Sequence, residues 1–313
     1  MNKKIISIII PAYNEENNIF PLYNELDNII KRNFKYDFEV IFINDGSSDS
    51  SWKKITDLAN INKNVRGINF TRNFGQQTAI TAGYEMASGD YVISMDCDLQ
   101  DPPELIIKML EKAEMGYDIV YARYIKNNES LFKKITSRLY YFIINKISDI
   151  NMPKNVGDFR LISKKIVKII NRLPEKSRYI RGLVCWTGFE YAFIDFERPK
   201  RKKGCTNYTL NKMLTLAFDG LTGFSVFPLK IAKYFGIFSF LTAFIGLVTM
   251  IIIQIFNFHT YPIWVYLIVI LFLFSSFQFI VLWLIGEYIE RVLKEQKKRP
   301  AYLVKEYLNT KND

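Results

Sequence analysis

Histidine and cysteine are nearly absent from this 313-residue chain, which contains one His and three Cys. The single histidine, His259, cannot supply a His-rich metal site, and any histidine-based catalytic triad would depend on it alone. Cys97, Cys185 and Cys205 cannot build a disulfide framework and are not spaced as zinc ligands. This scarcity fits a chain whose bulk lies in a reducing compartment.

Glycine-rich nucleotide motifs, internal repeats and low-complexity segments are also missing. Neither G-x-G-x-x-G nor a Walker A motif occurs, so dinucleotide and P-loop chemistry are not indicated. Acidic residues are outnumbered, with 31 Asp and Glu against 42 Lys and Arg, which gives a net charge of +11. A hydrophobic content of 49% excludes an intrinsically disordered chain.

Charge is wholly missing from residues 234–286, a stretch of 53 residues without Asp, Glu, Lys or Arg. A bilayer core needs about 20 apolar residues per helix, so this stretch predicts a hairpin of two membrane spans, 235–256 and 263–285. Two buried helices of a soluble core are the alternative, but such helices rarely run so long without charge.

Basic residues flank this stretch, and the connecting loop, which contains His259, has none. Lys230 and Lys233 precede the first span, and five Lys and Arg lie in 291–299. By the positive-inside rule, both termini face the cytoplasm of an inner (cytoplasmic) membrane protein with two spans. The apolar run 5–10 imitates a signal peptide but is too short for one.

Short β-branched runs alternate with helical patterns over residues 1–125, which favours an α/β fold with a parallel, doubly wound sheet. Polar clusters follow the first four predicted strands, and ligands of open α/β sheets bind at the carboxyl ends of the strands. The predicted strands are 5–10, 39–44, 65–70, 91–95 and 119–121. The predicted helices are 15–32, 50–62, 76–88 and 103–115.

Two carboxylates in these clusters, Asp96 and Asp98, suggest a cation site. In an extended segment both would face one side and Cys97 the other. Two hard oxygen ligands without histidine suit Mg²⁺ or Mn²⁺. A bare Asp-x-Asp pair is a weak signal, and its place at a strand end strengthens it.

Asp45, at the end of the second strand, is well placed to accept hydrogen bonds from a base or a ribose. Its neighbours Ser47 and Asp49 are better explained as a turn and a helix cap. Tyr13 could stack on a base or pack on the sheet edge, and Glu15 leaves the same choice between ligand and scaffold.

Four motifs together resemble the family 2 glycosyltransferases of GT-A fold, and within them the polyprenyl-phosphate glycosyltransferases, which include bactoprenol glucosyltransferase and dolichol-phosphate mannose synthase. They are PAYNEE (11–16), NDGSSD (44–49), RNFGQQTAITAGYEMASGDY (72–91) and MDCDLQDPPE (95–104). Motifs at 120–124, 157–165, 178–189, 202–213 and 285–304 agree, so the resemblance covers nearly the whole chain. Thr206 replaces a serine found in many relatives and keeps its hydroxyl.

The resemblance implies inverting transfer of a sugar, glucose or a related hexose, from a UDP-linked nucleotide diphosphate-sugar to a membrane polyprenyl (undecaprenyl) phosphate. The product would donate its sugar to cell-envelope glycosylation. The implied domains are a catalytic domain at 1–205, an amphipathic juxtamembrane segment at 206–233, the hairpin at 234–286 and a basic cytoplasmic tail at 287–313.

The resemblance also implies roles for individual residues. The donor nucleotide is bound by Pro11, Tyr13, Glu15, Asp45, Gln76 and Asp96. The metal, Mg²⁺ or Mn²⁺, is held by Asp96, Asp98 and Gln100. The catalytic group comprises Asp98, Arg123, Asp158 and Arg160.

The nucleophile would be a phosphate monoester, whose second pKa of about 6 leaves it largely anionic at neutral pH. A strong general base is therefore less necessary than stabilisation of the diphosphate and of the acceptor charge. Asp158 could then be a positioning group, an optional base or a structural ion-pair partner. Arg123 or Arg160 could form paired hydrogen bonds to the acceptor phosphate.

Two segments, 131–147 and 210–224, have amphipathic patterns that favour contact with the bilayer surface, although both could instead pack on the sheet. The basic run 198–203 suits anionic lipid headgroups or substrate phosphate better than nucleic acid. A homo-oligomer is possible. Two other functions stay open: a family 2 transferase acting on a polysaccharide or glycolipid, and a non-catalytic membrane scaffold.

Overall fold

The computed structural model describes residues 3–125, 153–175, 178–197, 262–297 and 299–310, with six further residues between 241 and 252. The chain divides into two compact units, Met1–Gly220 with Pro300–Asp313, and Leu221–Arg299. Several predicted features lie outside the described residues: the segments 131–147 and 210–224, the basic run 198–203, Thr206 and the loop with His259.

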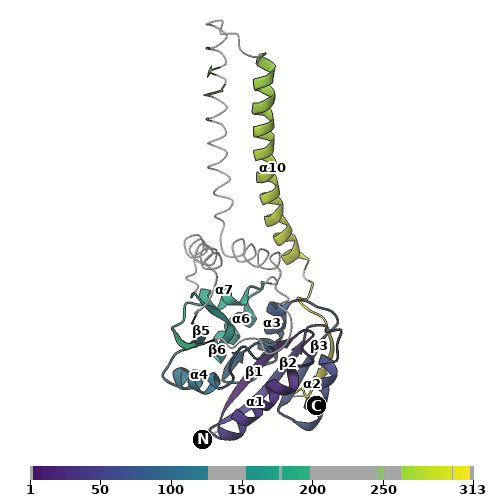
Figure 1. The fold of residues 1–313 in the computed structure, drawn as a ribbon, viewed down its shortest axis with the longest axis vertical. Helices are drawn as coiled ribbons and strands as arrows, with labels where there is room; N and C mark the ends of the chain where they lie inside the picture. The colour runs from purple at the N-terminus through teal and green to yellow at the C-terminus, as the bar shows by residue number, and fades with distance from the viewer. Residues whose placement is uncertain are drawn as a thin grey trace. The chain divides into compact units, whose positions relative to one another are not determined.

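The first unit is built on an eight-stranded sheet with the order β7-β5-β6-β4-β1-β2-β3-β8 (Figure 1). The strands are β1 (Lys4–Ala12), β2 (Tyr36–Asn44), β3 (Val65–Phe70), β4 (Tyr91–Ser94), β5 (Ile119–Tyr124), β6 (Val156–Ser163), β7 (Tyr191–Phe196) and β8 (Val304–Leu308). The helices of this unit are α1 (Ile19–Arg32), α2 (Ser51–Ile61), α3 (Gln76–Met86), α4 (Leu105–Glu114), α6 (Lys164–Arg172) and α7 (Ile180–Trp186).

The central strands are buried on both faces, which explains their almost continuous apolar sequences. Ile8 and Ile10 of β1 belong to a core that includes side chains of α1, α2 and α4. On the other face α3 lies close against β1, and a Cβ added at Gly83 would come within 2.3 Å of Cγ2 of Ile9. Gly83 therefore allows the close packing of α3, the helix that begins with Gln76.

The predicted strands and helices of residues 1–125 are confirmed, with shifted ends. Helix α1 begins at Ile19 rather than at residue 15, because Asn18 and Ile19 donate their N–H groups to the carbonyl of Glu15 in a preceding turn. The predicted strands β1 to β5 run in the same direction, as expected, and the structure adds two antiparallel strands from beyond residue 125. Strand β6 runs antiparallel between β4 and β5, and β8 runs antiparallel to β3.

Strand β8 comes from the segment predicted as a basic tail, residues 287–313. The structure divides that segment between the end of α10 (Ile263–Gln296) in the second unit and a strand of the first unit. Thr71 donates its N–H to the carbonyl of Leu303 at 3.0 Å, and Trp52 donates to Glu306 at 2.9 Å. The strand thus covers the edge that β3 would otherwise expose.

Tyr302, which precedes β8, is expected to contribute measurably to the stability of this unit. Its ring stacks on Phe70 with 4.8 Å between centroids, and its hydroxyl donates to Glu85 at 2.6 Å. Tyr302→Ala should lower the free energy of unfolding by about 2–3 kcal/mol, and Tyr302→Phe, which keeps the ring, by about 1 kcal/mol. Denaturant unfolding of the full chain measures both. A Tyr302→Ala variant as stable as the wild type would show that the residues before β8 are not packed against Phe70 and the rest of the first unit.

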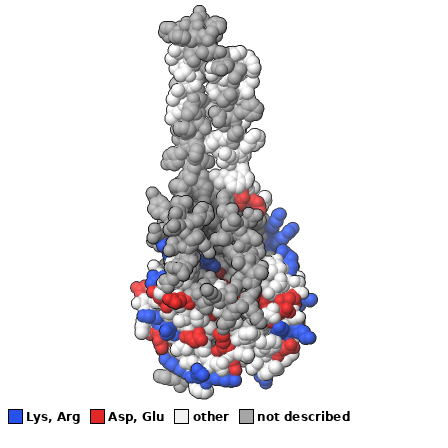
Figure 2. Space-filling view, in the orientation of Figure 1, with Lys and Arg blue, Asp and Glu red and all other residues white. Residues whose placement is uncertain are grey.

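No helix formed by the described residues is long and apolar enough to span a membrane. The first predicted span, 235–256, lies mostly outside those residues, so the membrane hairpin stays a prediction. On the face drawn in Figure 2, the described Lys and Arg side chains of the first unit are interspersed with Asp and Glu.

Candidate active site

The loops after β1 and β2 are joined by hydrogen bonds between backbone and side chains. The backbone N–H groups of Asn14, Glu15 and Glu16 donate to Ser47, Ser51 and Asp49 at 2.9, 2.9 and 3.2 Å. The other oxygen of Asp49 accepts the N–H of Ser51, the first residue of α2, at 2.9 Å. A structural role for Ser47 and Asp49 is confirmed, although only Asp49 contacts the start of α2, and the N-cap residue itself is Ser50.

The predicted donor residues of the first loop differ in accessibility. Tyr13 is 39% exposed, so its ring is not packed away on the sheet edge. Glu15 accepts a hydrogen bond from the Asn18 amide, and Pro11 belongs to β1. The structure places all three at the carboxyl end of β1, where the prediction requires them.

Asp45 is buried and holds the loop that leads into α3. Its two carboxylate oxygens accept the N–H groups of Phe74 at 2.7 Å and Gly75 at 2.9 Å. Burial raises the pKa of this carboxyl group, although the two hydrogen bonds and the charge of Arg72 oppose the shift. Gly46 has a φ of +65°, and a Cβ there would lie 2.2 Å from the carbonyl carbon of Arg72. Asp45 is thus a scaffold for this loop, and its contact with a nucleotide stays a prediction.

The segment with Asp96 and Asp98 leaves the extended conformation at the end of β4. Asp96 donates its N–H to Asp101 at 2.9 Å, and Asp98 accepts the N–H of Gln100 at 3.1 Å. Leu99 between them has a left-handed φ of 61°. The extended geometry assumed for Asp96 and Asp98 is therefore wrong, because a turn begins at Cys97.

The described residues contain no cluster of three or more His, Cys, Asp or Glu side chains arranged to hold a metal ion. Asp96 and Asp98 nevertheless offer oxygen ligands of the kind that Mg²⁺ and Mn²⁺ prefer. These two carboxylates fit a cation that takes its remaining ligands from water and from the diphosphate of a substrate.

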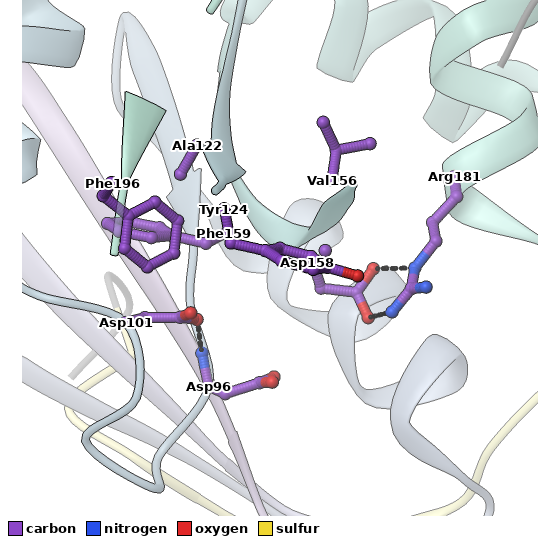
Figure 3. Close-up of a pocket in the computed structure, with 10 residues that line it drawn as sticks. Asp96, Asp101, Ala122, Tyr124, Val156, Asp158, Phe159, Arg181 and Phe196 are labelled. Atoms are coloured by element: carbon purple, nitrogen blue, oxygen red, sulfur yellow. Dashed lines mark hydrogen bonds and ion pairs between the residues drawn. The ribbon is translucent and has the colours of Figure 1, made fainter. Parts of the chain in front are cut away.

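A pocket opens beside this turn, with acidic, basic and aromatic walls (Figure 3). Its polar side chains are those of Asp96, Asp101, Asp158 and Arg181, and its aromatic wall includes Tyr124 and Phe196. These residues come from the loop after β4, from β5, β6 and β7, and from α7. The pocket thus combines segments that are far apart in the sequence.

Asp158 is buried and accepts several hydrogen bonds from arginine and glutamine side chains. Its oxygens accept from Arg160, from Nε and Nη2 of Arg181 at 3.0 and 2.8 Å, and from the amides of Gln76 and Gln77, both at 3.3 Å. Burial alone would raise the pKa of Asp158, but the charges and hydrogen bonds of Arg181, together with Arg160 and Gln77, hold it well below its usual range. Asp158 is therefore ionised at every physiological pH.

Arg160 is wholly buried, with no exposed surface, and does not line the pocket. One of its nitrogens, Nη2, donates to Asp158. Among the described residues, neither Nε nor Nη1 of Arg160 has a hydrogen-bond partner. A contact of Arg160 with an acceptor phosphate would require this guanidinium to become exposed, and it stays a prediction.

Arg123, the other predicted phosphate ligand, lies on β5 and is engaged with β7. Its Nε and Nη2 donate to the two oxygens of Asp195 at 2.6 and 2.9 Å, and its guanidinium lies 4.3 Å from the centroid of the Phe193 ring. It is not among the residues that line the described pocket. A role at the acceptor would require Arg123 to exchange this partner.

Gln76 and Gln77, at the start of α3, connect the two sides of the site. The amide of Gln76 donates to Asp96 at 2.7 Å as well as to Asp158, so it bridges the predicted donor and acceptor residues. The amide oxygen of Gln77 accepts the N–H of Ile180, the first residue of α7, at 3.0 Å. The pair therefore fixes the position of Asp158 relative to both Asp96 and α7.

The residues of the site that were not assigned a role from the sequence include Gln77, Asp101 and Arg181. Arg181 lies within the motif at 178–189 that carries the resemblance, yet no local pattern distinguishes it from Arg178. Its importance arises from the approach of α7 to β6, which is a tertiary contact. The only sequence signal for a role of Gln77 is its position next to Gln76, which was predicted to bind the donor.

An α/β domain with carboxylates at the carboxyl ends of its strands has the arrangement at which open α/β sheets bind ligands, and comparison with known proteins gives the family. Residues 7–170 match the family model of glycosyl transferase family 2. The chain is 42% identical to the uncharacterized glycosyltransferase YkcC of Bacillus subtilis (strain 168), over 98% of this chain and 95% of that protein. It is 38% identical to the bactoprenol glucosyl transferase of Shigella phage SfX, over 96% and 98%.

Among solved structures, the chain is similar to glucosyl-3-phosphoglycerate synthase from Mycobacterium tuberculosis in complex with Mn²⁺, uridine-diphosphate-glucose and phosphoglyceric acid. The TM-score is 0.49 at 14% identity, over 70% of this chain and 78% of that one. The chain belongs to glycosyl transferase family 2. The family predicted from the motifs is confirmed, as is its α/β GT-A class.

Proposed function

We propose that this protein transfers a hexose, glucose or a close relative, from a UDP-linked sugar to a membrane polyprenyl phosphate with inversion at the anomeric carbon. The observation that carries the proposal is the match to relatives named bactoprenol glucosyl transferase, which extends over 96% of this chain. That match includes both the α/β unit and the uncharged stretch 234–286.

On the donor side, the loops with Tyr13 and Asp45 would hold the nucleotide beside Asp96. The carboxylates of Asp96 and Asp98 would hold Mg²⁺ or Mn²⁺, which when bound stabilises the negative charge of the departing diphosphate. On the acceptor side, the phosphate is anionic at neutral pH and can attack without prior loss of a proton. The residues of the pocket then have to orient the two substrates and exclude water.

We further propose that residues 235–256 and 263–285 anchor the protein in the inner membrane, with both termini in the cytoplasm. The uncharged stretch supports this anchor, and so do the exposed apolar side chains along α10, among them Trp264, Leu271 and Phe279. A membrane anchor brings the enzyme to an acceptor whose isoprenoid tail is buried in the bilayer. The segments 131–147 and 210–224 would then contact anionic lipid at its surface.

The proposal is tested by supplying membranes that contain the protein with a panel of labelled nucleotide sugars and undecaprenyl phosphate, followed by lipid extraction. We expect one nucleotide sugar to label the lipid fraction, in membranes with the protein and not in matched membranes without it. Label in a polysaccharide or glycolipid, with none in polyprenyl phosphate, would favour the other family 2 activity. No transfer from any nucleotide sugar would favour a non-catalytic scaffold.

A further inference from the structure

The pocket described above has one cationic side chain among its described lining residues, that of Arg181. Arg181 is the second residue of α7, and its side chain is 25% exposed. Figure 3 shows it reaching from α7 to Asp158, with Asp96 and Asp101 across the pocket. Arg181 is therefore accessible to a ligand in this pocket, whereas Arg160 is wholly buried.

Asp96 and Asp101 make the opposite wall of the pocket acidic, and the local charge around Arg181 offers a cation to an anion on this side. The carboxylate of Asp158 faces two guanidinium groups, those of Arg160 and Arg181, so this cluster has a surplus positive charge. Arg160 is enclosed, which leaves Arg181 as the member of the cluster that an incoming anion can contact. A phosphate monoester matches the planar donor arrangement of a guanidinium.

The orientation of Arg181 is fixed from two directions. Asp158 binds its Nε and Nη2 through both carboxylate oxygens, and Gln77 holds the first turn of α7 through the N–H of Ile180. Five donors surround the carboxylate of Asp158, which has about four acceptor positions. A carboxylate saturated in this way is suited to holding an arginine in place.

We propose that Arg181 is the residue that contacts the acceptor phosphate, and that Asp158 and Gln77 are positioning residues that hold its guanidinium at the pocket wall. The proposal rests on the proposed transfer to a polyprenyl phosphate and adds to it the residue that recognises the phosphate. It also gives Asp158 the role of an anchor rather than that of a base.

Arg181→Lys in the full-length, membrane-embedded protein is the principal test, because lysine keeps the charge and loses the paired donors. Initial rates are measured against undecaprenyl phosphate, with the nucleotide sugar that the wild type uses held at saturation. We expect the KM for undecaprenyl phosphate to rise about tenfold or more, the order expected when a charge-assisted pair of hydrogen bonds is lost. The affinity for the nucleotide sugar, measured by titration, should stay unchanged.

Arg181→Ala provides a second readout that a structural role would not produce. Added guanidinium ion should partly restore transfer by this variant, and it should not restore Gln77→Ala, whose Arg181 is present but displaced. The matched control is Arg178→Lys, three residues earlier, whose side chain bonds to Glu85 and to the carbonyls of Leu173 and Glu175. This control should keep the wild-type KM for the lipid.

Three results would overturn the inference. They are an unchanged KM for undecaprenyl phosphate in a folded Arg181→Lys variant, a parallel loss of nucleotide-sugar affinity, and equal guanidinium rescue of Arg181→Ala and Gln77→Ala. Each of them requires a wild type that transfers sugar to undecaprenyl phosphate. A wild type without that activity contradicts the proposed function itself, so the two failures are distinguishable.

Discussion

Asp98→Asn is expected to lower kcat/KM for sugar transfer by about 10²- to 10³-fold while the domain stays folded. Asparagine keeps a side-chain oxygen that can accept the N–H of Gln100, so the turn around Leu99 is retained. The substitution removes the negative charge that would hold a divalent cation against the diphosphate. Transfer rates measured against Mg²⁺ and Mn²⁺ concentration, after removal of metal by a chelator, give the result.

A matched control for this prediction is Asp118→Asn, at the amino end of β5. Asp118 accepts from Ser163 at 2.7 Å and pairs with Lys165 on the surface, away from the strand ends that carry the site. Its variant should transfer sugar at the wild-type rate. Full activity of the wild type in excess chelator would falsify the metal role of Asp96 and Asp98.

The parts of the fold that could be predicted from the sequence are those with local patterns. Strands β1 to β5 are apolar runs separated by helical patterns and turn residues, so their positions follow from periodicity. Strand β6 was missed because its buried sequence includes Asp158 and Arg160. Strand β8 has the sequence VKEYL and pairs Leu308 with Gly67, a partner that no local pattern connects to it.

The site shows the same division between local and tertiary information. The motifs correctly placed Asp45, Asp96 and Asp98 at one edge of the sheet, because parallel strands end together. The motifs did not distinguish Asp158 from Arg160. These residues are two positions apart on β6, so their side chains leave the same face of the strand. Arg160 pairs in register with Ser94 and Tyr121, deeper in the sheet, so its side chain is enclosed while Asp158 reaches the pocket.

The role of Asp158 depends on contacts that the sequence could not supply. Its partners Gln76, Gln77 and Arg181 come from the starts of α3 and α7, and each contact spans more than 20 residues of chain. The prediction left a base, a positioning group and a structural ion-pair partner open. The two arginines and two glutamine amides around the carboxylate favour the positioning role.

Asp158→Asn is therefore expected to reduce the free energy of unfolding by about 3–5 kcal/mol, because it leaves Arg160 and Arg181 without their counter-charge. The pKa of Asp158 is lower in the folded than in the unfolded chain, so its contribution to stability is present above about pH 4. That contribution is lost as the pH falls through the folded pKa. Thermal unfolding should show a constant difference from the wild type near neutral pH, narrowing only in strong acid.

The control for this destabilisation is Asp27→Asn, which removes an exposed ion pair. Asp27 lies 2.6 Å from Lys31 one helical turn away, and the Lys31 side chain is 71% exposed. Pairs of this kind contribute about 0.3–0.5 kcal/mol, so this variant should unfold almost as the wild type does. A similar loss in both variants would contradict the buried ion-pair cluster around Asp158.

The decisive measurement for the chemistry is the rate of Asp158→Asn against pH with saturating undecaprenyl phosphate, at a temperature where the variant is folded. The acceptor phosphate titrates near pH 6, so the wild type should lose activity below about that pH for a reason that does not involve Asp158. The variant should be slower because Arg181 is less well held, and it should keep the same acidic limb. If the substitution instead removes the limb together with most of the rate, the limb belongs to Asp158. Asp158 would then be the general base, and the acceptor would have to be deprotonated during the reaction.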